Sequence, residues 1–167
     1  RPEGGYAGKA PLLHRISHAN TSTPEERVRN GVIDPQYELL VSPNPRRPVT
    51  IELILNNRDD SPHPFHLHGH KFWVLDSYEI DMQYGGYGDW EDEGQSKNYN
   101  LSRAMKRDTV IVPMRGHLVL RWRADNPGVW AFHCHMLVHL ASGMAMSFAE
   151  MPEVLQANPS VPAHCGM

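Results

Sequence analysis

The sequence lacks the features that would assign it to a membrane or to nucleic acid. None of its apolar runs approaches the roughly 18 residues of a transmembrane helix, and its start shows no signal-peptide pattern. Its 16 basic and 19 acidic residues form no long block of either sign. We therefore expect neither a membrane nor a nucleic acid among its partners. The first residue is not Met, which indicates a processed or partial product.

Cysteine is scarce, with only two in 167 residues. Cys134 lies in a histidine-rich segment and Cys165 in the C-terminal tail, so we do not expect them to pair with each other. A leftover cysteine in a secreted chain suggests a bond to another polypeptide, and we predict such a disulfide for Cys165. Glycosylation sequons at Asn20 and Asn100 are compatible with a secreted, extracellular protein.

Turn-forming residues and apolar alternation divide the chain into three parts. Residues 1–46 are rich in Gly, Pro, Ser and Asn and are expected to be extended or turn structure. Residues 47–150 form the predicted domain, and residues 151–167 form a tail. The apolar pattern predicts strands near residues 49–55, 72–75, 109–112, 118–123, 129–135 and 144–148. Residues 76–93 are acidic and predict a long loop. Short strands with Pro and Gly turns predict an all-β fold, an antiparallel sandwich or barrel.

Histidines cluster along the chain. Seven of the eleven lie in two short segments, residues 63–70 and 133–139. A blue-copper site takes two imidazoles, one thiolate and a weak axial Met. The second segment supplies Cys134 and His139, and Met144 follows at the same spacing. The missing imidazole can come from either outer member of the first segment, His63 or His70.

The two-residue period of a strand decides between them, because alternate residues point to opposite faces. His66 and His68 share a face. His63 lies an odd number of positions from His66, and Pro64 favours an extended chain between the two. His63 should therefore point the other way, and it is the predicted blue-copper ligand.

In the second segment His133 and His135 share one face, and Cys134 occupies the opposite face with Trp130 and Phe132, which should keep the thiolate dry. Same-face residues are about 6.6 Å apart at Cα, and paired metals sit roughly 3.5 to 4 Å apart, so one histidine fits each metal of a second centre. Cys134 is then covalently adjacent to ligands of that centre, which gives electrons a short through-bond route.

The two segments resemble the copper motifs of the third, C-terminal cupredoxin domain of multicopper oxidases, in the laccase and ascorbate oxidase group. The motifs are His-Pro-Phe-His-Leu-His-Gly-His from residue 63 and Asn-Pro-Gly-Val-Trp-Ala-Phe-His-Cys-His from residue 126. The resemblance implies a cupredoxin-like fold and a type 1 copper held by His63, Cys134, His139 and Met144. It further implies that His66 binds the type 2 copper and that the type 3 pair is bound by His68, His133 and His135.

The resemblance also implies a partner. The oxygen-reducing cluster of this family uses twice as many histidines as the four offered here, and nothing in this chain resembles the two His-x-His motifs that supply the others. We therefore expect the N-terminal part of the same oxidase as a separate chain, linked through Cys165. The full enzyme would hold four coppers. Electrons from a small-molecule reductant would enter at His139 and pass along Cys134, and O2 would be reduced to water.

The reductant stays open among phenols and related aromatics, ascorbate and ferrous iron. Residues around His139 are apolar and carry no carboxylate, which favours phenols, with ascorbate as the leading alternative. A ferroxidase would need acids beside that histidine, and the only candidates are in the loop 76–93. A blue-copper electron carrier, which is not an enzyme, and a copper nitrite reductase are rival readings, but neither needs histidines on both sides of Cys134.

The remaining histidines lack the spacing of metal ligands. We expect His70 to support its loop and not to bind copper. The other four are interpreted as ordinary histidines: His14, His18, His117 and His164.

Overall fold

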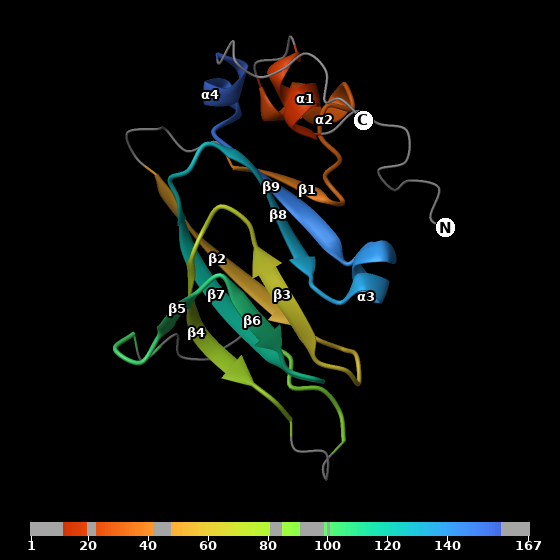
Figure 1. The fold of residues 1–167 in the computed structure, drawn as a ribbon, viewed down its shortest axis with the longest axis vertical. Helices are drawn as coiled ribbons and strands as arrows, with labels where there is room; N and C mark the ends of the chain where they lie inside the picture. Colours follow the sequence, from red (N-terminus) through yellow and green to blue (C-terminus); the bar gives the residue numbers. More distant parts are fainter. Residues whose placement is uncertain are drawn as a thin grey trace.

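Two β-sheets packed face to face form the body of the protein (Figure 1). The computed structural model describes residues 12–19, 23–41, 48–80, 85–90, 99 and 101–157. One sheet has the strand order β1-β9-β8-β3-β6 and the other β2-β7-β4-β5. The strands are β1 (Glu38–Val41), β2 (Val49–Asn56), β3 (His63–Leu67), β4 (Phe72–Tyr78), β5 (Met105–Arg107), β6 (Thr109–Val112), β7 (His117–Ala124), β8 (Gly128–Cys134) and β9 (Ala145–Glu150).

Buried side chains from both sheets form the main core between them. Strand β7 contributes Leu118, Leu120 and Trp122, which face inward as their alternation predicted. Phe132 of β8 and Phe148 of β9 meet them from the other sheet, and the Trp122 and Phe148 rings pack edge to face with centroids 5.0 Å apart. Each large apolar side chain buried in this way stabilises the fold by roughly 1.5 to 3 kcal/mol.

The prediction of an all-β sandwich is confirmed, with one correction to its antiparallel character. Among the described strands every pair is antiparallel except β1 and β9, which pair in parallel from Glu38 opposite Ser147 to Val41 opposite Glu150. A parallel pair needs a long connection. Here most of the chain lies between the two strands, so no local signal marks the pairing.

The expectation of extended or turn structure before residue 46 is wrong for two helices in the described part. This segment contains α1 (Leu12–Ser17), α2 (Pro24–Arg29) and β1. Pro24 stands in the first turn of α2, where its missing N–H costs nothing, and Thr23 with Glu26 forms a capping box. Proline therefore begins this helix and does not interrupt it.

Helices from the described segments on both sides of the predicted domain pack against the sandwich. Ile16 of α1 and Leu155 of α4 (Pro152–Gln156) form a second buried cluster with Ala149 of β9. The Arg27 side chain is fully buried and bonds Glu153 at 3.2 Å and Gln156 Oε1 at 3.0 Å. These three helices lie together at one end of the molecule (Figure 1).

The predicted strands are present, with shifted ends. Strand β4 continues to Tyr78 and takes in the start of the acidic segment, while residues 79–80 and 85–90 lie outside helices and strands. Strand β8 ends at Cys134, and a short helix, α3 (Leu137–Ala141), connects it to β9. None of the helices in the described ranges is long and apolar enough to cross a membrane.

The turn between β3 and β4 is held by hydrogen bonds to β8 and to the residues just before it. Its Gly69 has a positive φ of 70°, and its carbonyl accepts a hydrogen bond from Asn126 Nδ2 at 2.9 Å. The backbone N–H of His68 donates to Ala131 O at 2.9 Å. A Cβ at position 69 would overlap the Trp130 ring. The position of His68 therefore depends on a glycine at this turn.

We predict that Gly69→Ala lowers the free energy of unfolding of the intact protein by about 2 to 4 kcal/mol, through backbone strain and overlap with Trp130. Gly31→Ala is the matched control, because Gly31 has a φ of 68° and open space around its Cβ position. It should cost only about 1 kcal/mol of strain. Urea unfolding of both variants measures the difference. Equal losses would show that contact with Trp130 is irrelevant.

Candidate metal centres

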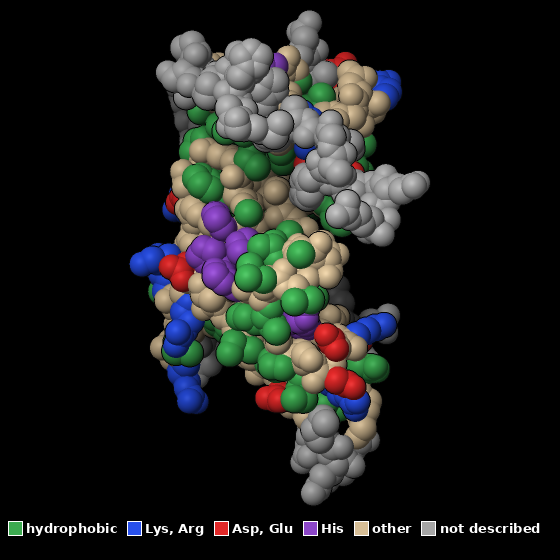
Figure 2. Space-filling view, turned by 45° about the vertical axis from the view of Figure 1, so that its right-hand side comes forward, with side chains coloured by type: hydrophobic (Ala, Val, Ile, Leu, Met, Phe, Trp, Pro, Cys, Tyr) green, Lys and Arg blue, Asp and Glu red, His purple; other side chains and the backbone are tan. Residues whose placement is uncertain are grey.

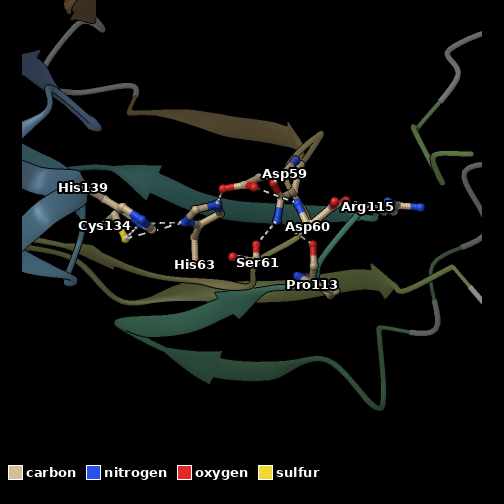
Figure 3. A network of polar contacts seen from close by, with 9 residues as sticks. Asp59, Asp60, Ser61, His63, Pro113, Arg115, Cys134 and His139 are labelled. Atoms are coloured by element: carbon tan, nitrogen blue, oxygen red, sulfur yellow. Dashed lines mark hydrogen bonds and ion pairs between the residues drawn. The ribbon is translucent and has the colours of Figure 1, made fainter. Parts of the chain in front are cut away.

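Three side chains from three different elements converge on one buried point (Figure 3). His63 begins β3, Cys134 ends β8 and His139 lies within α3. The Nδ1 atoms of the two histidines are 3.0 Å apart, and Cys134 Sγ lies 4.0 Å from His63 Nδ1 and 3.7 Å from His139 Nδ1. Cys134 is fully buried and His63 is 3% exposed. Two imidazoles and a thiolate at these separations fit one copper ion between them.

The outer nitrogen of His63 faces a carboxylate. With Nδ1 turned to the thiolate, Nε2 lies 3.2 Å from Asp59 Oδ2, an ion-pair distance without the geometry of a hydrogen bond. The Asp59 side chain is 53% exposed and so joins the buried imidazole to solvent (Figure 3). The sequence interpretation missed this acid, because it considered only residues 76–93. The sole signal was an acid four positions before the first histidine of the motif.

Met144 borders the same point. Its backbone N–H donates to His139 O at 2.9 Å, and its carbonyl accepts from the Cys134 N–H at 3.0 Å. Met144 and His63 also line one cavity of about 370 Å³. These contacts hold Met144 beside the three ligands, and its role as the axial ligand remains a prediction.

Four other histidines form a second group on the exposed side of the five-stranded sheet. His66 of β3 pairs in register with His133 of β8. The His68 and His133 Nε2 atoms are 3.1 Å apart, and the His133 and His135 rings have centroids 5.7 Å apart. Histidine side chains gather in one patch on this face, beside apolar side chains (Figure 2). The predicted division of the histidines between two faces is therefore the one in the structure.

Hydrogen-bond partners orient the rings of this second group. His66 Nδ1 lies 3.0 Å from both Asp108 O and Thr109 Oγ1, and His133 Nδ1 lies 3.0 Å from Cys134 O. A carbonyl can only accept, so Nδ1 carries the proton and Nε2 offers its lone pair to a metal. Burial, and then the charges of the three neighbouring imidazoles, lower the pKa of His68, which favours its neutral, ligand-competent form.

The two groups meet at Cys134. Its side chain belongs to the first group, while the flanking His133 and His135 belong to the second. The His135 N–H donates to Pro64 O at 2.7 Å, which ties the end of β8 to β3. Which copper each of these histidines binds stays a prediction.

The histidines expected to be ordinary have other partners. His70 Nε2 lies 3.0 Å from Glu150 Oε1, and its ring packs edge-on against Trp130. His117 is buried between Gly88 O, 2.7 Å from its Nδ1, and Asp76 Oδ2, 3.2 Å from its Nε2. Several predicted features lie outside the described residues: Asn20, Asn100, His164, Cys165 and the side chain of His14.

We predict that Cys134→Ser in the intact, copper-loaded protein abolishes the intense blue absorption expected of a copper–thiolate site, because a hydroxyl cannot replace the thiolate. Cys165→Ser is the matched control and should keep the colour. Visible absorption of the copper-loaded proteins measures both. Blue colour surviving in the Cys134 variant would overturn the thiolate assignment.

Replacing Met144 with Leu should raise the reduction potential of the blue copper, because a thioether donates weakly to Cu(II) and leucine does not. We expect a shift on the order of 60 mV, a tenfold change for a one-electron couple. Met146→Leu is the control, since Met146 packs against the core. Redox titration of the blue band measures both, and an unchanged or lower potential for Met144→Leu would make its sulfur a packing group.

Comparison with known proteins identifies the family of this chain. The family model of multicopper oxidases matches residues 7–154. The iron transport multicopper oxidase FET5 of Saccharomyces cerevisiae is 45% identical over an alignment of 117 residues, and the match covers 64% of this chain and 18% of that protein. The L-ascorbate oxidase of Nicotiana tabacum is 41% identical over an alignment of 125 residues, and the match covers 71% of this chain and 20% of that protein.

A solved structure shares the fold. The crystal structure of Fet3p, described as a multicopper oxidase that functions in iron import, superposes with a TM-score of 0.71 at 28% identity, over 93% of this chain and 27% of that one. The chain spans about a fifth of the length of the curated relatives it matches. Since the family model covers most of its residues, this chain belongs to the multicopper oxidase family.

Proposed function

We propose that this chain is the part of a copper-dependent oxidase that receives electrons from a reductant and passes them to an oxygen-reducing cluster. The observation that carries the proposal is the junction at Cys134, whose thiolate and flanking imidazoles face two different groups of ligands. Copper, when bound, supplies the one-electron redox chemistry by which four electrons reduce O2 to water. A protein that only carries electrons would not need the second group of histidines.

The residues divide into roles by the group in which they lie. His63, Cys134, His139 and Met144 would hold the type 1 copper in a dry environment. The second group would supply His66 to the type 2 copper and His68, His133 and His135 to the type 3 pair. Phe132, which is buried and stacks on Phe65 with centroids 4.8 Å apart, keeps water from the thiolate.

We further propose that the N-terminal part of the same oxidase completes the cluster. His68 and His135 are exposed on the face of the second group, and imidazoles there have room for ligands from another polypeptide. Such a part would bring the further histidines that the resemblance calls for. The predicted disulfide at Cys165 would link the two chains covalently, and a secreted location would suit such a bond.

The reductant that the site supports best is Fe(II). The sequence favoured phenols because no acid could be assigned beside His139. Asp59 supplies an acid beside the other imidazole of the blue-copper group, His63. Its half-exposed carboxylate can bind a ferrous ion from solvent, and its contact with His63 Nε2 offers a short path to the thiolate side of that ring. Two of the similar proteins described above are named for iron transport or iron import.

Phenol oxidation is the second candidate, and exposed apolar residues favour it. Leu137 and Val138 are 81% and 73% exposed beside His139 on α3. An aromatic donor could rest on them against the imidazole edge. Ascorbate stays the third candidate, supported by a similar ascorbate oxidase and by no residue of this chain that would orient it.

Asp59→Asn should lower kcat/KM for Fe(II) at least about tenfold, or roughly 1.4 kcal/mol of transition-state stabilisation, because the amide cannot hold the cation. The same variant should oxidise a simple diphenol at nearly the wild-type rate. Glu52→Gln is the control, since Glu52 pairs with Arg121 on the outer face of the four-stranded sheet. Steady-state rates on Fe(II), the diphenol and ascorbate decide the substrate. Equal losses on Fe(II) and the diphenol would contradict iron binding at Asp59.

A further inference from the structure

Two arginines, Arg58 and Arg115, lie close enough to Asp59 for their guanidinium groups to compete for its carboxylate. Arg58 precedes it directly, and both residues line the cavity that His63 and Met144 share. Arg115 donates its backbone N–H to Asp59 O at 3.0 Å. Either side chain could neutralise the Asp59 carboxylate and repel a ferrous ion. In the described part of the chain, each is instead paired with a different acid.

Arg58 is turned toward Asp89. Its Nε and Nη2 lie 3.1 and 2.6 Å from Asp89 Oδ2, and the hydrogen bond and charge of Asp89 raise the pKa of Arg58. Arg58 is 72% exposed, whereas Asp89 is only 20% exposed. An exposed ion pair contributes little to stability by itself. The position of Asp89 must therefore come from its surroundings.

The backbone on both sides of Asp89 is fixed. The Gly88 N–H donates to Arg115 O at 2.6 Å, and Gly88 O lies 2.7 Å from His117 Nδ1. The Trp90 N–H donates to Asn56 Oδ1 at 2.8 Å, and the Trp90 ring packs edge-on against His117. Asp89 is thus held in place beside Arg58 by hydrogen bonds of the residues on both sides of it.

The second guanidinium is paired in the same way. Arg115 Nε bonds Asp60 Oδ1, and this bond lowers the pKa of Asp60. The Asp60 N–H donates to Asp59 Oδ1 at 2.7 Å, which orients the Asp59 carboxylate (Figure 3). Asp89 and Asp60 are therefore the ion-pair partners of the two arginines, and the Asp59 carboxylate faces His63 and the solvent.

We infer that Asp89 is a positioning residue that determines specificity for Fe(II), because it holds the Arg58 guanidinium away from Asp59. The inference rests on the proposed oxidation of Fe(II) at this site. Without the Asp89 carboxylate, Arg58 gains an unpaired positive charge beside the cavity and can turn to its neighbour Asp59. Fe(II) binding weakens, while a neutral reductant that rests on α3 is unaffected.

The test is a double-mutant cycle in the intact oxidase. Asp89→Asn should raise KM for Fe(II) about tenfold with kcat nearly unchanged, and should alter kcat/KM for a neutral diphenol less than about twofold. Adding Arg58→Gln to that variant should restore KM for Fe(II), because it removes the competing charge. Asp89→Glu should stay close to the wild type. Glu52→Gln, which removes an acid from a remote ion pair, should change nothing, and the blue absorption reports correct folding.

Three outcomes separate the explanations. If Asp89→Asn leaves KM for Fe(II) unchanged in a blue, active protein, Asp89 has no such role. If KM rises but Arg58→Gln does not restore it, Asp89 acts by another route and the inference is overturned. A wild-type oxidase that does not oxidise Fe(II) overturns the proposed function, and the role of Asp89 with it.

Discussion

The two-residue period of β8 is the constraint on which both candidate metal centres depend. Successive side chains of a strand point to opposite faces, so Cys134 enters the buried side while His133 joins His66 and His68 on the exposed side. In a helix, neighbouring residues diverge by only about 100° and could not serve two separate centres so directly. The strand thus joins a buried thiolate to an exposed imidazole through one peptide bond.

Burial makes the first centre depend on its metal. A thiolate that is fully buried, with an imidazole that is 3% exposed, is costly to bring out of water. Copper would offset that cost, so its binding free energy also stabilises the meeting of β3, β8 and α3. The acids outside this buried group of ligands lie closer to solvent. Asp59 and Asp60 are exposed and Asp89 is partly buried, and we propose that the pairing of Asp60 and Asp89 with arginines leaves the Asp59 carboxylate for a substrate.

Features that follow from the alternation of side chains along a strand could be predicted from the sequence. Strand alternation alone predicted that His63 and His66 point to opposite faces, and that Cys134 and His133 do so too. The core positions of β7 follow from the same alternation. Residues in irregular segments could not be assigned. Asp59 precedes β3 in a loop whose direction no period fixes, and the partners Arg58 and Asp89 are 31 positions apart. No local signal marks the parallel pairing of β1 and β9. The proline content of residues 1–46 was taken as a sign of turns, but Pro24 begins a helix, because proline occurs both at helix starts and in turns.

We propose that this chain joins a blue-copper site to a second copper cluster that it shares with another part of the oxidase. The copper content of the intact oxidase, combined with electron paramagnetic resonance before and after reduction, tests this proposal. We expect four coppers per molecule, with one blue centre, one type 2 centre and a magnetically coupled pair that is silent in the resonance spectrum. A single copper with no sign of a coupled pair would contradict it.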